Sequence, residues 1–225
     1  MPLNPQDHLD NLVRHIDLVR GDPGPLRPPI EDIDKYWLPH EKAQALRQDL
    51  LAGDSAQQIE ALTQFVAETQ LEQVPEAVRR YAKLVILDTL GVILAGAGRP
   101  EVRQLRERLS ATAGTGATVF APGWPVNDPR TAALLNGIAG RSLELGEGHR
   151  YVSYQGAMQI LPGVLSVGEW AQSTGREMLT ALILGYDAGA RIAAAMTTRP
   201  LAHQNGQAAL LGAAAAGARL RGLNA

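Results

Sequence analysis

The sequence predicts an all-α fold, a helical bundle, and three observations support this prediction. Apolar residues recur at helical spacing through most of residues 56–225. Proline and short polar residues stand where helices would begin. The one clear extended stretch, residues 118–120, is too short to found a sheet. With 225 residues, 45% of them hydrophobic, the chain is long enough to bury one real core.

Residues 1–55 are predicted to form a proline-containing N-terminal arm, apart from the helical domain at 56–225. Four prolines fall within residues 21–29, where they preclude regular structure: Pro23, Pro25, Pro28 and Pro29. Helices are expected on either side, near residues 5–20 and 38–51. The arm either wraps around a partner or extends into solvent.

The helical domain opens with two predicted helices. Ser55 and Gln58 have the spacing of a capping box. The apolar positions that follow at helical spacing are Ile59, Leu62, Phe65 and Val66. Pro75 suits the first turn of a second helix that ends near Gly96. Its predicted apolar face comprises Val78, Tyr81, Ala82, Val85, Ile86 and Leu90.

Pro100 opens a third helix, and Asp128 with Pro129 begins a fourth that is expected to reach about Leu145. An apolar helix then extends to about Gln172, with Pro162 near its first turn.

The last two predicted helices are rich in small residues. Thr174 and Glu177 form a capping box for a helix over residues 178–196. The final helix, residues 206–220, is dominated by alanine and glycine. Small side chains let helix backbones approach closely, so we expect this helix to lie between other helices.

Composition excludes several classes of function. A net charge of −2 without a basic block argues against nucleic acid as a partner. The absence of cysteine excludes disulfides, thiolate metal sites and cysteine nucleophiles. We expect no metal and no cofactor, since repeated ligand spacing and glycine-rich phosphate loops are missing. Without an apolar run of roughly 20 residues or a targeting segment, we expect a cytoplasmic protein with no membrane partner.

Residues 143–151 gather two carboxylates, an imidazole, a guanidinium and a phenol at the end of an apolar helix. One interpretation is a functional site, because such groups transfer protons and bind anions. The alternative is that these side chains merely cap the helix end and solvate a loop. The residues alone leave both interpretations open.

An ordered series of segments resembles the MmgE/PrpD family over about residues 57–225. The matching segments are residues 65–69, 82–96, 117–120, 132–137, 143–151, 174–177, 185–187 and 211–216. The family includes 2-methylcitrate dehydratase, cis-aconitate decarboxylase and iminodisuccinate epimerase. The resemblance implies a helical domain that, with a smaller α/β lid domain, encloses a site for polycarboxylates or their relatives. It covers the helical domain only, so we expect the lid and the family's catalytic lysine segment to be absent from this chain.

The resemblance also assigns residues to a catalytic group: His149, His203, Glu144 and Tyr151. Glu144 falls where the family usually has an active-site aspartate, and His203 resembles a histidine that the family keeps near the substrate. The residues expected to bind substrate are Arg150, Glu147, Tyr154, Gln155 and Asn205. His149 beside Glu147 would abstract a proton next to a carboxylate, and Arg150 would pair with a substrate carboxylate.

One departure from the family lies at Gln155, where the family usually has histidine. A carboxamide can orient a substrate but cannot take a proton at neutral pH. Another is Gly146, which replaces the first of two adjacent acids.

Three functions remain open at this stage. The favoured one is a subunit of a split lyase or isomerase that acts on a carboxylate-bearing small molecule, with a second protein subunit completing the site. The alternatives are a stand-alone homo-oligomeric isomerase or cyclase, and a non-catalytic structural partner of a related enzyme.

Overall fold

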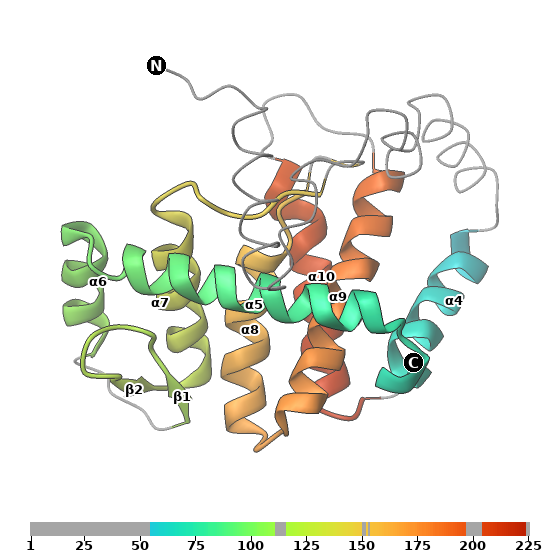
Figure 1. The fold of residues 1–225 in the computed structure, drawn as a ribbon, viewed down its shortest axis with the longest axis horizontal. Helices are drawn as coiled ribbons and strands as arrows, with labels where there is room; N and C mark the ends of the chain where they lie inside the picture. Colours follow the sequence, from blue (N-terminus) through green and yellow to red (C-terminus); the bar gives the residue numbers. More distant parts are fainter. Residues whose placement is uncertain (1–54, 111–115, 150–151, 153, 197–203, 224–225) are drawn as a thin grey trace, which may run out of the picture. The chain divides into compact units, whose positions relative to one another are not determined.

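The computed structural model describes residues 55–110, 116–149, 152, 154–196 and 204–223, which form an all-α domain (Figure 1). The predicted fold class is confirmed. The predicted arm lies outside the described residues apart from Ser55. The elements in chain order are α4 (Ser55–Glu68), the 3₁₀ turn η1 (Leu71–Gln73), α5 (Glu76–Gly96), α6 (Pro100–Ser110), β1 (Ala117–Thr118), β2 (Val126–Asn127), α7 (Pro129–Arg141), α8 (Ala157–Trp170), α9 (Gly175–Ala195) and α10 (Gln204–Leu220).

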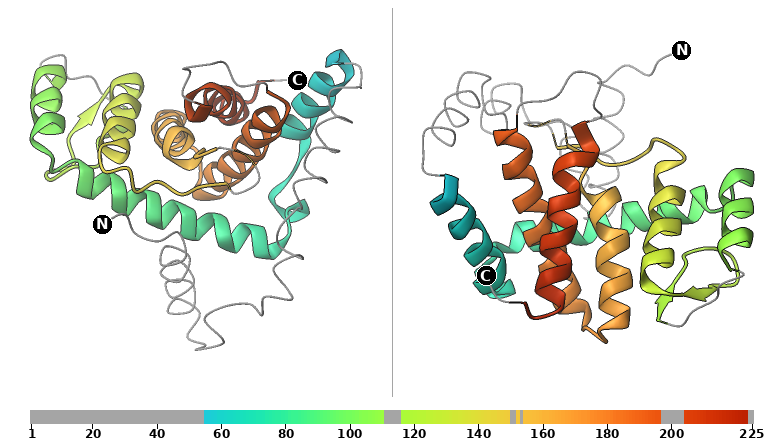
Figure 2. Two further views of the ribbon diagram at one scale, coloured as in Figure 1. Left: turned by 90° about the horizontal axis from the view of Figure 1, so that it is seen from above. Right: turned by 180° about the vertical axis from the view of Figure 1, so that it is seen from behind.

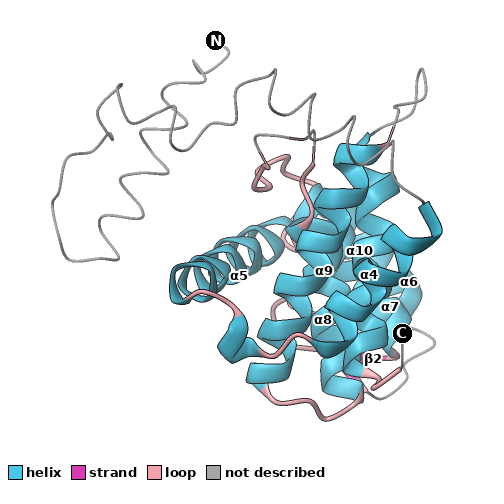
Figure 3. Ribbon diagram, turned by 90° about the vertical axis from the view of Figure 1, so that its right-hand side faces the viewer, coloured by secondary structure: helices cyan, strands magenta, loops and turns pink. Residues whose placement is uncertain are grey.

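Helices α7, α8 and α9 stand side by side, and α5 crosses one face of this row (Figures 1 and 2). Helix α10 packs on the opposite side against α8 and α9. Seen from the side, α5 lies apart from α8, α9 and α10 as a layer of its own (Figure 3). The small hairpin pairs Ala117 with Asn127 and Thr118 with Val126 in antiparallel register.

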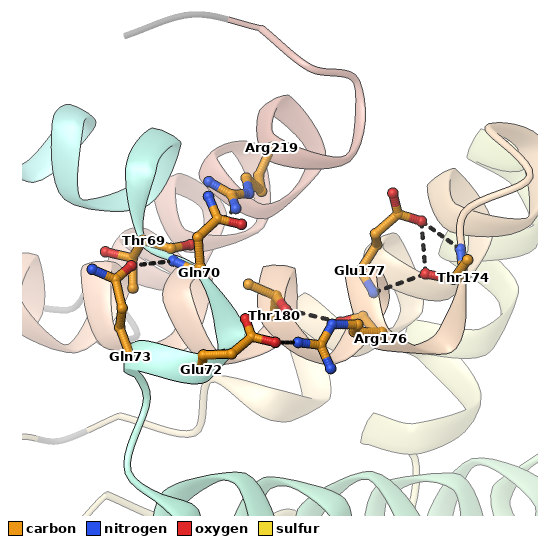
Figure 4. A network of polar contacts seen from close by, with 9 residues as sticks. All are labelled: Thr69, Gln70, Glu72, Gln73, Thr174, Arg176, Glu177, Thr180 and Arg219. Atoms are coloured by element: carbon orange, nitrogen blue, oxygen red, sulfur yellow. Dashed lines mark hydrogen bonds and ion pairs between the residues drawn. The ribbon is translucent and has the colours of Figure 1, made fainter.

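Two predicted helix starts are confirmed in atomic detail. The Asp128 carboxylate accepts hydrogen bonds from the amides of Arg130 and Thr131, at 3.1 and 3.2 Å. The Thr174 hydroxyl accepts from the Glu177 amide, and the Glu177 carboxylate accepts from the Thr174 amide, which completes a capping box (Figure 4). These side chains satisfy amides that have no partner within the helix.

Two helix boundaries differ from the prediction. Helix α7 ends at Arg141 and not near Leu145, because Glu144 adopts a left-handed backbone with φ of 53° that a helix cannot continue through. Pro162 is the sixth residue of α8, beyond the first turn. Proline has no amide hydrogen, so α8 lacks one backbone hydrogen bond at this position.

The predicted apolar face of α5 is partly wrong. Val78 and Tyr81 are 44% and 51% exposed, whereas the buried residues all lie in the second half of the helix: Thr89, Val92, Ile93 and Gly96. Contacts with α7 account for this difference, because the second half of α5 is the part that lies against α7. Spacing identified the helix but not the half that it buries.

The close approach expected of α10 occurs between Gly185 of α9 and Gly212 of α10. A Cβ atom on Gly212 would lie 2.5 Å from the Gly185 carbonyl oxygen. The expectation that α10 lies between helices is only half right, because Leu210 and Leu211 on its outer face are 69% and 49% exposed.

Arg219, near the end of α10, ties that helix to the end of α4. Its guanidinium donates hydrogen bonds to the carbonyl oxygens of Val66, Ala67 and Thr69, the first and last at 3.0 and 2.9 Å (Figure 4 shows Arg219 beside Thr69). The last carbonyls of a helix have no internal partner, so a basic side chain stabilises them.

Candidate functional site

The loop between α7 and α8 carries the predicted site residues that the structure describes: Glu144, Glu147, His149, Tyr154 and Gln155. The predicted Arg150, Tyr151 and His203 lie outside the described residues. Asn205 belongs to the first turn of α10, and its side chain is not described.

Glu147 is the half-buried carboxylate of this loop. Its Oε1 atom accepts a hydrogen bond from the Ala157 amide at 2.9 Å, at the N-terminus of α8. Its Oε2 atom is buried and makes no close hydrogen bond within the described part of the chain. Burial raises the pKa of Glu147, while the Ala157 amide and the Tyr186 hydroxyl oppose the rise. A carboxyl group with a raised pKa holds a proton more readily than a free one and can exchange it with a substrate.

Tyr186 of α9 joins this loop to the helical row. Its ring lies edge-to-face against Tyr154 with centroids 5.2 Å apart, and its centroid is 6.2 Å from that of His149. Burial and the neighbouring Glu147 carboxylate raise the pKa of Tyr186, which therefore keeps its proton at neutral pH. The residue was not predicted as part of the site, although its segment, residues 185–187, was among those matching the family.

His149 and Tyr154 are held together by the backbone. The His149 amide donates to the Tyr154 carbonyl oxygen at 2.7 Å, which forms an isolated antiparallel bridge. Burial lowers the pKa of His149, with Asp187 acting in the opposite direction. A lowered pKa favours the neutral imidazole, the form that can accept a proton.

The Tyr154 side chain is almost completely buried, with 1% exposed. Its phenol fits against three glycines, Gly156, Gly189 and Gly212, at each of which a Cβ atom would meet the ring or hydroxyl. The hydroxyl makes no hydrogen bond to the described residues. Burial, followed by the Glu147 carboxylate, raises its pKa. Tyr154 thus places a protonated phenol between α9 and α10.

Arg141, the last residue of α7, holds the other two predicted residues. One nitrogen donates to Gln155 Oε1 at 2.7 Å, and another lies 2.9 Å from Glu144 Oε2. A guanidinium has only donors, so the amide must turn its oxygen toward Arg141 and its NH₂ group away. Gln155 is thereby oriented as a hydrogen-bond donor on its other side. Glu144 is 68% exposed in this ion pair and does not join Glu147 in the partly buried cluster.

No three histidine, aspartate or glutamate side chains of the described residues come together as metal ligands. Within the described part of the chain, helix α9 alone has the length and composition of a membrane span, and half of this stretch is buried within the domain, so it is weak evidence for a membrane location. The absence of a membrane partner and the cytoplasmic location therefore stay predictions.

Fold and loop together define an all-helical domain with a partly buried polar cluster of one carboxylate, one imidazole and two phenols. Such clusters of shifted titrating groups are typical of small-molecule sites. The chain belongs to the MmgE/PrpD family, since the model of the MmgE/PrpD N-terminal domain matches residues 60–225.

Two curated proteins are similar to parts of the chain. The uncharacterized protein YvbT of Bacillus subtilis is 40% identical over 63 residues, which are 27% of this chain and 19% of that protein. The cis-aconitate decarboxylase-like protein oryM of Aspergillus oryzae is 27% identical over 143 residues, which are 60% of this chain and 30% of that protein. The chain thus matches less than a third of the length of either relative.

Proposed function

We propose that this domain carries the proton-transfer group of a lyase or isomerase that acts on a carboxylate-bearing small molecule. The observation that supports the proposal most directly is the half-buried Glu147 carboxylate. One of its oxygens is held by the start of α8, the other is buried without a close hydrogen bond among the described residues, and the Tyr186 hydroxyl lies near the group. The name of the Aspergillus relative, a decarboxylase-like protein, is consistent with this class of chemistry.

In the proposed step, Glu147 or the neutral His149 takes a proton from the carbon next to a substrate carboxylate. The C–H bond breaks, and its electron pair moves into the bond toward the carboxylate carbon, so negative charge builds on the carboxylate oxygens. Donors directed at these oxygens stabilise that charge. Loss of a leaving group from the next carbon would give a lyase, whereas return of the proton to the other face would give an isomerase.

The replacement Glu147→Gln tests the role of this carboxylate. The amide retains an oxygen that can accept from the Ala157 amide but cannot take a proton. Exchange of substrate hydrogen for deuterium, followed by NMR in D₂O with a panel of di- and tricarboxylates that includes cis-aconitate, reports proton abstraction whatever reaction follows. We expect the exchange rate to fall by about 10²- to 10⁴-fold.

Glu169→Gln is the matched control. Glu169 also accepts a backbone amide, that of Thr118, but it lies outside the loop. This variant should exchange substrate hydrogen at the wild-type rate. A third variant, Glu144→Gln, shows which acid matters. If Glu144→Gln abolishes exchange and Glu147→Gln does not, the assignment to Glu147 is wrong and the position implied by the family resemblance is right.

We further propose that a second protein subunit docks on the domain and completes the site. Large apolar side chains are exposed on several of the described helices, among them Leu87 of α5 at 65% and Leu210 of α10 at 69%. Exposed apolar groups of this size often mark an interface. The native mass of the chain, measured alone and after co-expression with the product of a neighbouring gene, tests this. A two-protein complex supports it, whereas a stable homo-oligomer supports the stand-alone alternative.

A further inference from the structure

A second candidate site lies at the opposite end of α7 from its capped N-terminus, in a groove between α6 and α7. The groove has a volume of about 660 Å³. This falls within the roughly 300–1,000 Å³ typical of small-molecule sites. We define the anion groove by its lining: Arg99, Glu101, Val102, Gln104, Leu105, Arg108, Ile138, Arg141 and Ser142.

The lining combines an apolar part with a cationic one. Val102, Leu105 and Ile138 belong to the core between α6 and α7, and they present an apolar surface to the groove. Three arginines accompany them, Arg99, Arg108 and Arg141, and two carboxylates lie close by: Glu101 beside Arg99, and Glu144 beside Arg141. The Arg99–Glu101 pair is 3.5 Å apart with side chains 49% and 71% exposed, so it neutralises little of this charge.

We propose that the anion groove binds a small organic anion with a short apolar body. Guanidinium groups bind carboxylates and phosphates in a planar, bidentate geometry. Three arginines line this groove. The apolar floor would cover the body of the ligand and remove it from water. An inorganic anion would pair with the arginines but would make no contact with the apolar residues of the groove.

Arg141 connects this groove to the candidate functional site. Arg141 lines the groove, and its guanidinium holds Glu144 and Gln155 in the loop before α8. An anion that pairs with Arg141 competes with the Glu144 carboxylate for it. Binding in the groove and the geometry of the loop are therefore coupled, and the coupling acts equally in both directions.

Calorimetric titration of the full chain with octanoate and, separately, with inorganic phosphate tests the proposal without any enzyme assay. We expect octanoate to bind with one-to-one stoichiometry and phosphate to bind much more weakly. Arg108→Ala should weaken octanoate binding at least about tenfold, the effect of losing one charge-assisted contact. Gln104 is an exposed residue of the lining, and Gln104→Glu should weaken octanoate binding because the added carboxylate repels the anion. Glu144→Gln should tighten it, because Arg141 is then released.

Arg103→Ala is the matched control, since Arg103 is an exposed arginine of the same helix that does not line the groove. It should bind octanoate as the wild type does. The proposal is overturned if Arg108→Ala and Gln104→Glu leave the affinity unchanged, if Arg103→Ala weakens it equally, or if phosphate binds as tightly as octanoate. Because the readout is binding, a failure of the proposed proton transfer would leave this result unaffected.

Discussion

Replacing Gly212 with alanine should test the packing of α9 against α10, which also positions Tyr154. The added methyl group would lie 2.5 Å from the Gly185 carbonyl oxygen, 2.9 Å from Ile160 Cδ1 and 3.2 Å from the Tyr154 hydroxyl. The first of these neighbours is backbone, so it cannot rotate away. Relief of the clash requires that α10 move away from α9.

Gly217, on the same helix, provides the comparison, because a methyl group there would meet nothing within 4 Å. Both replacements gain the same helix propensity, about 1 kcal/mol. The difference between the two variants therefore isolates the clash, which overpacking data place at about 1–3 kcal/mol. For a chain of this size that corresponds to a gap in Tm of about 2–12 °C.

Thermal and urea unfolding, followed by circular dichroism, would measure both variants side by side. We expect Gly217→Ala to be at least as stable as the wild type and Gly212→Ala to be the less stable of the two. Equal stabilities, or a more stable Gly212→Ala, would refute the close approach of α9 and α10 and with it the position assigned to Tyr154.

Three further predictions concern stability. Burial raises the pKa of Glu147 above its ordinary value of 4.5. The group therefore favours folding below pH 4.5, and this contribution to stability is lost as pH rises through the pKa of the folded state. In urea titrations between pH 4 and pH 8, the stability of Glu147→Gln should rise relative to that of the wild type. Asp128→Ala should be less stable than the wild type at pH 7, because the cap is lost. A hydrogen bond from the Thr131 side chain lowers the Asp128 pKa from 3.8, so the difference from wild type should shrink as pH falls below that value. A difference that stays constant with pH would contradict the capping role. Arg219→Gln should speed amide exchange in α4 while α8 keeps its protection, which mass spectrometry of deuterated peptides would show.

Local chemistry made the helices predictable. Asp128 and Thr174 start helices in the structure as their side chains indicate, since a cap depends on atoms within three residues. The end of α7 was misplaced because the left-handed backbone of Glu144 depends on its ion pair with Arg141 and on the loop beyond. The buried half of α5 depends on where that helix crosses α7, which spacing along one helix does not contain.

The candidate site could be predicted only in part for the same reason. Glu147, His149 and Tyr154 are close in the sequence, and the structure keeps them in one loop. Tyr186 comes from a helix more than 30 residues later, and its contact with Tyr154 arises from tertiary packing. Glu144 and Glu147 are three residues apart, yet Glu144 is exposed and Glu147 is half-buried with one oxygen out of contact with solvent, a difference that composition cannot show.

The contacts of Arg219 also bear on the order in which the domain can fold. Its bonds to the carbonyl oxygens of α4 join residues 150 to 153 positions apart. A ribosome that adds about 5–20 residues per second would need roughly 8–30 s to synthesise the intervening chain. During that time the end of α4 has only water or transient partners for those carbonyls. Helix α4 should therefore be among the last elements to become protected in a refolding or translation time course, although it is the first described helix to be made.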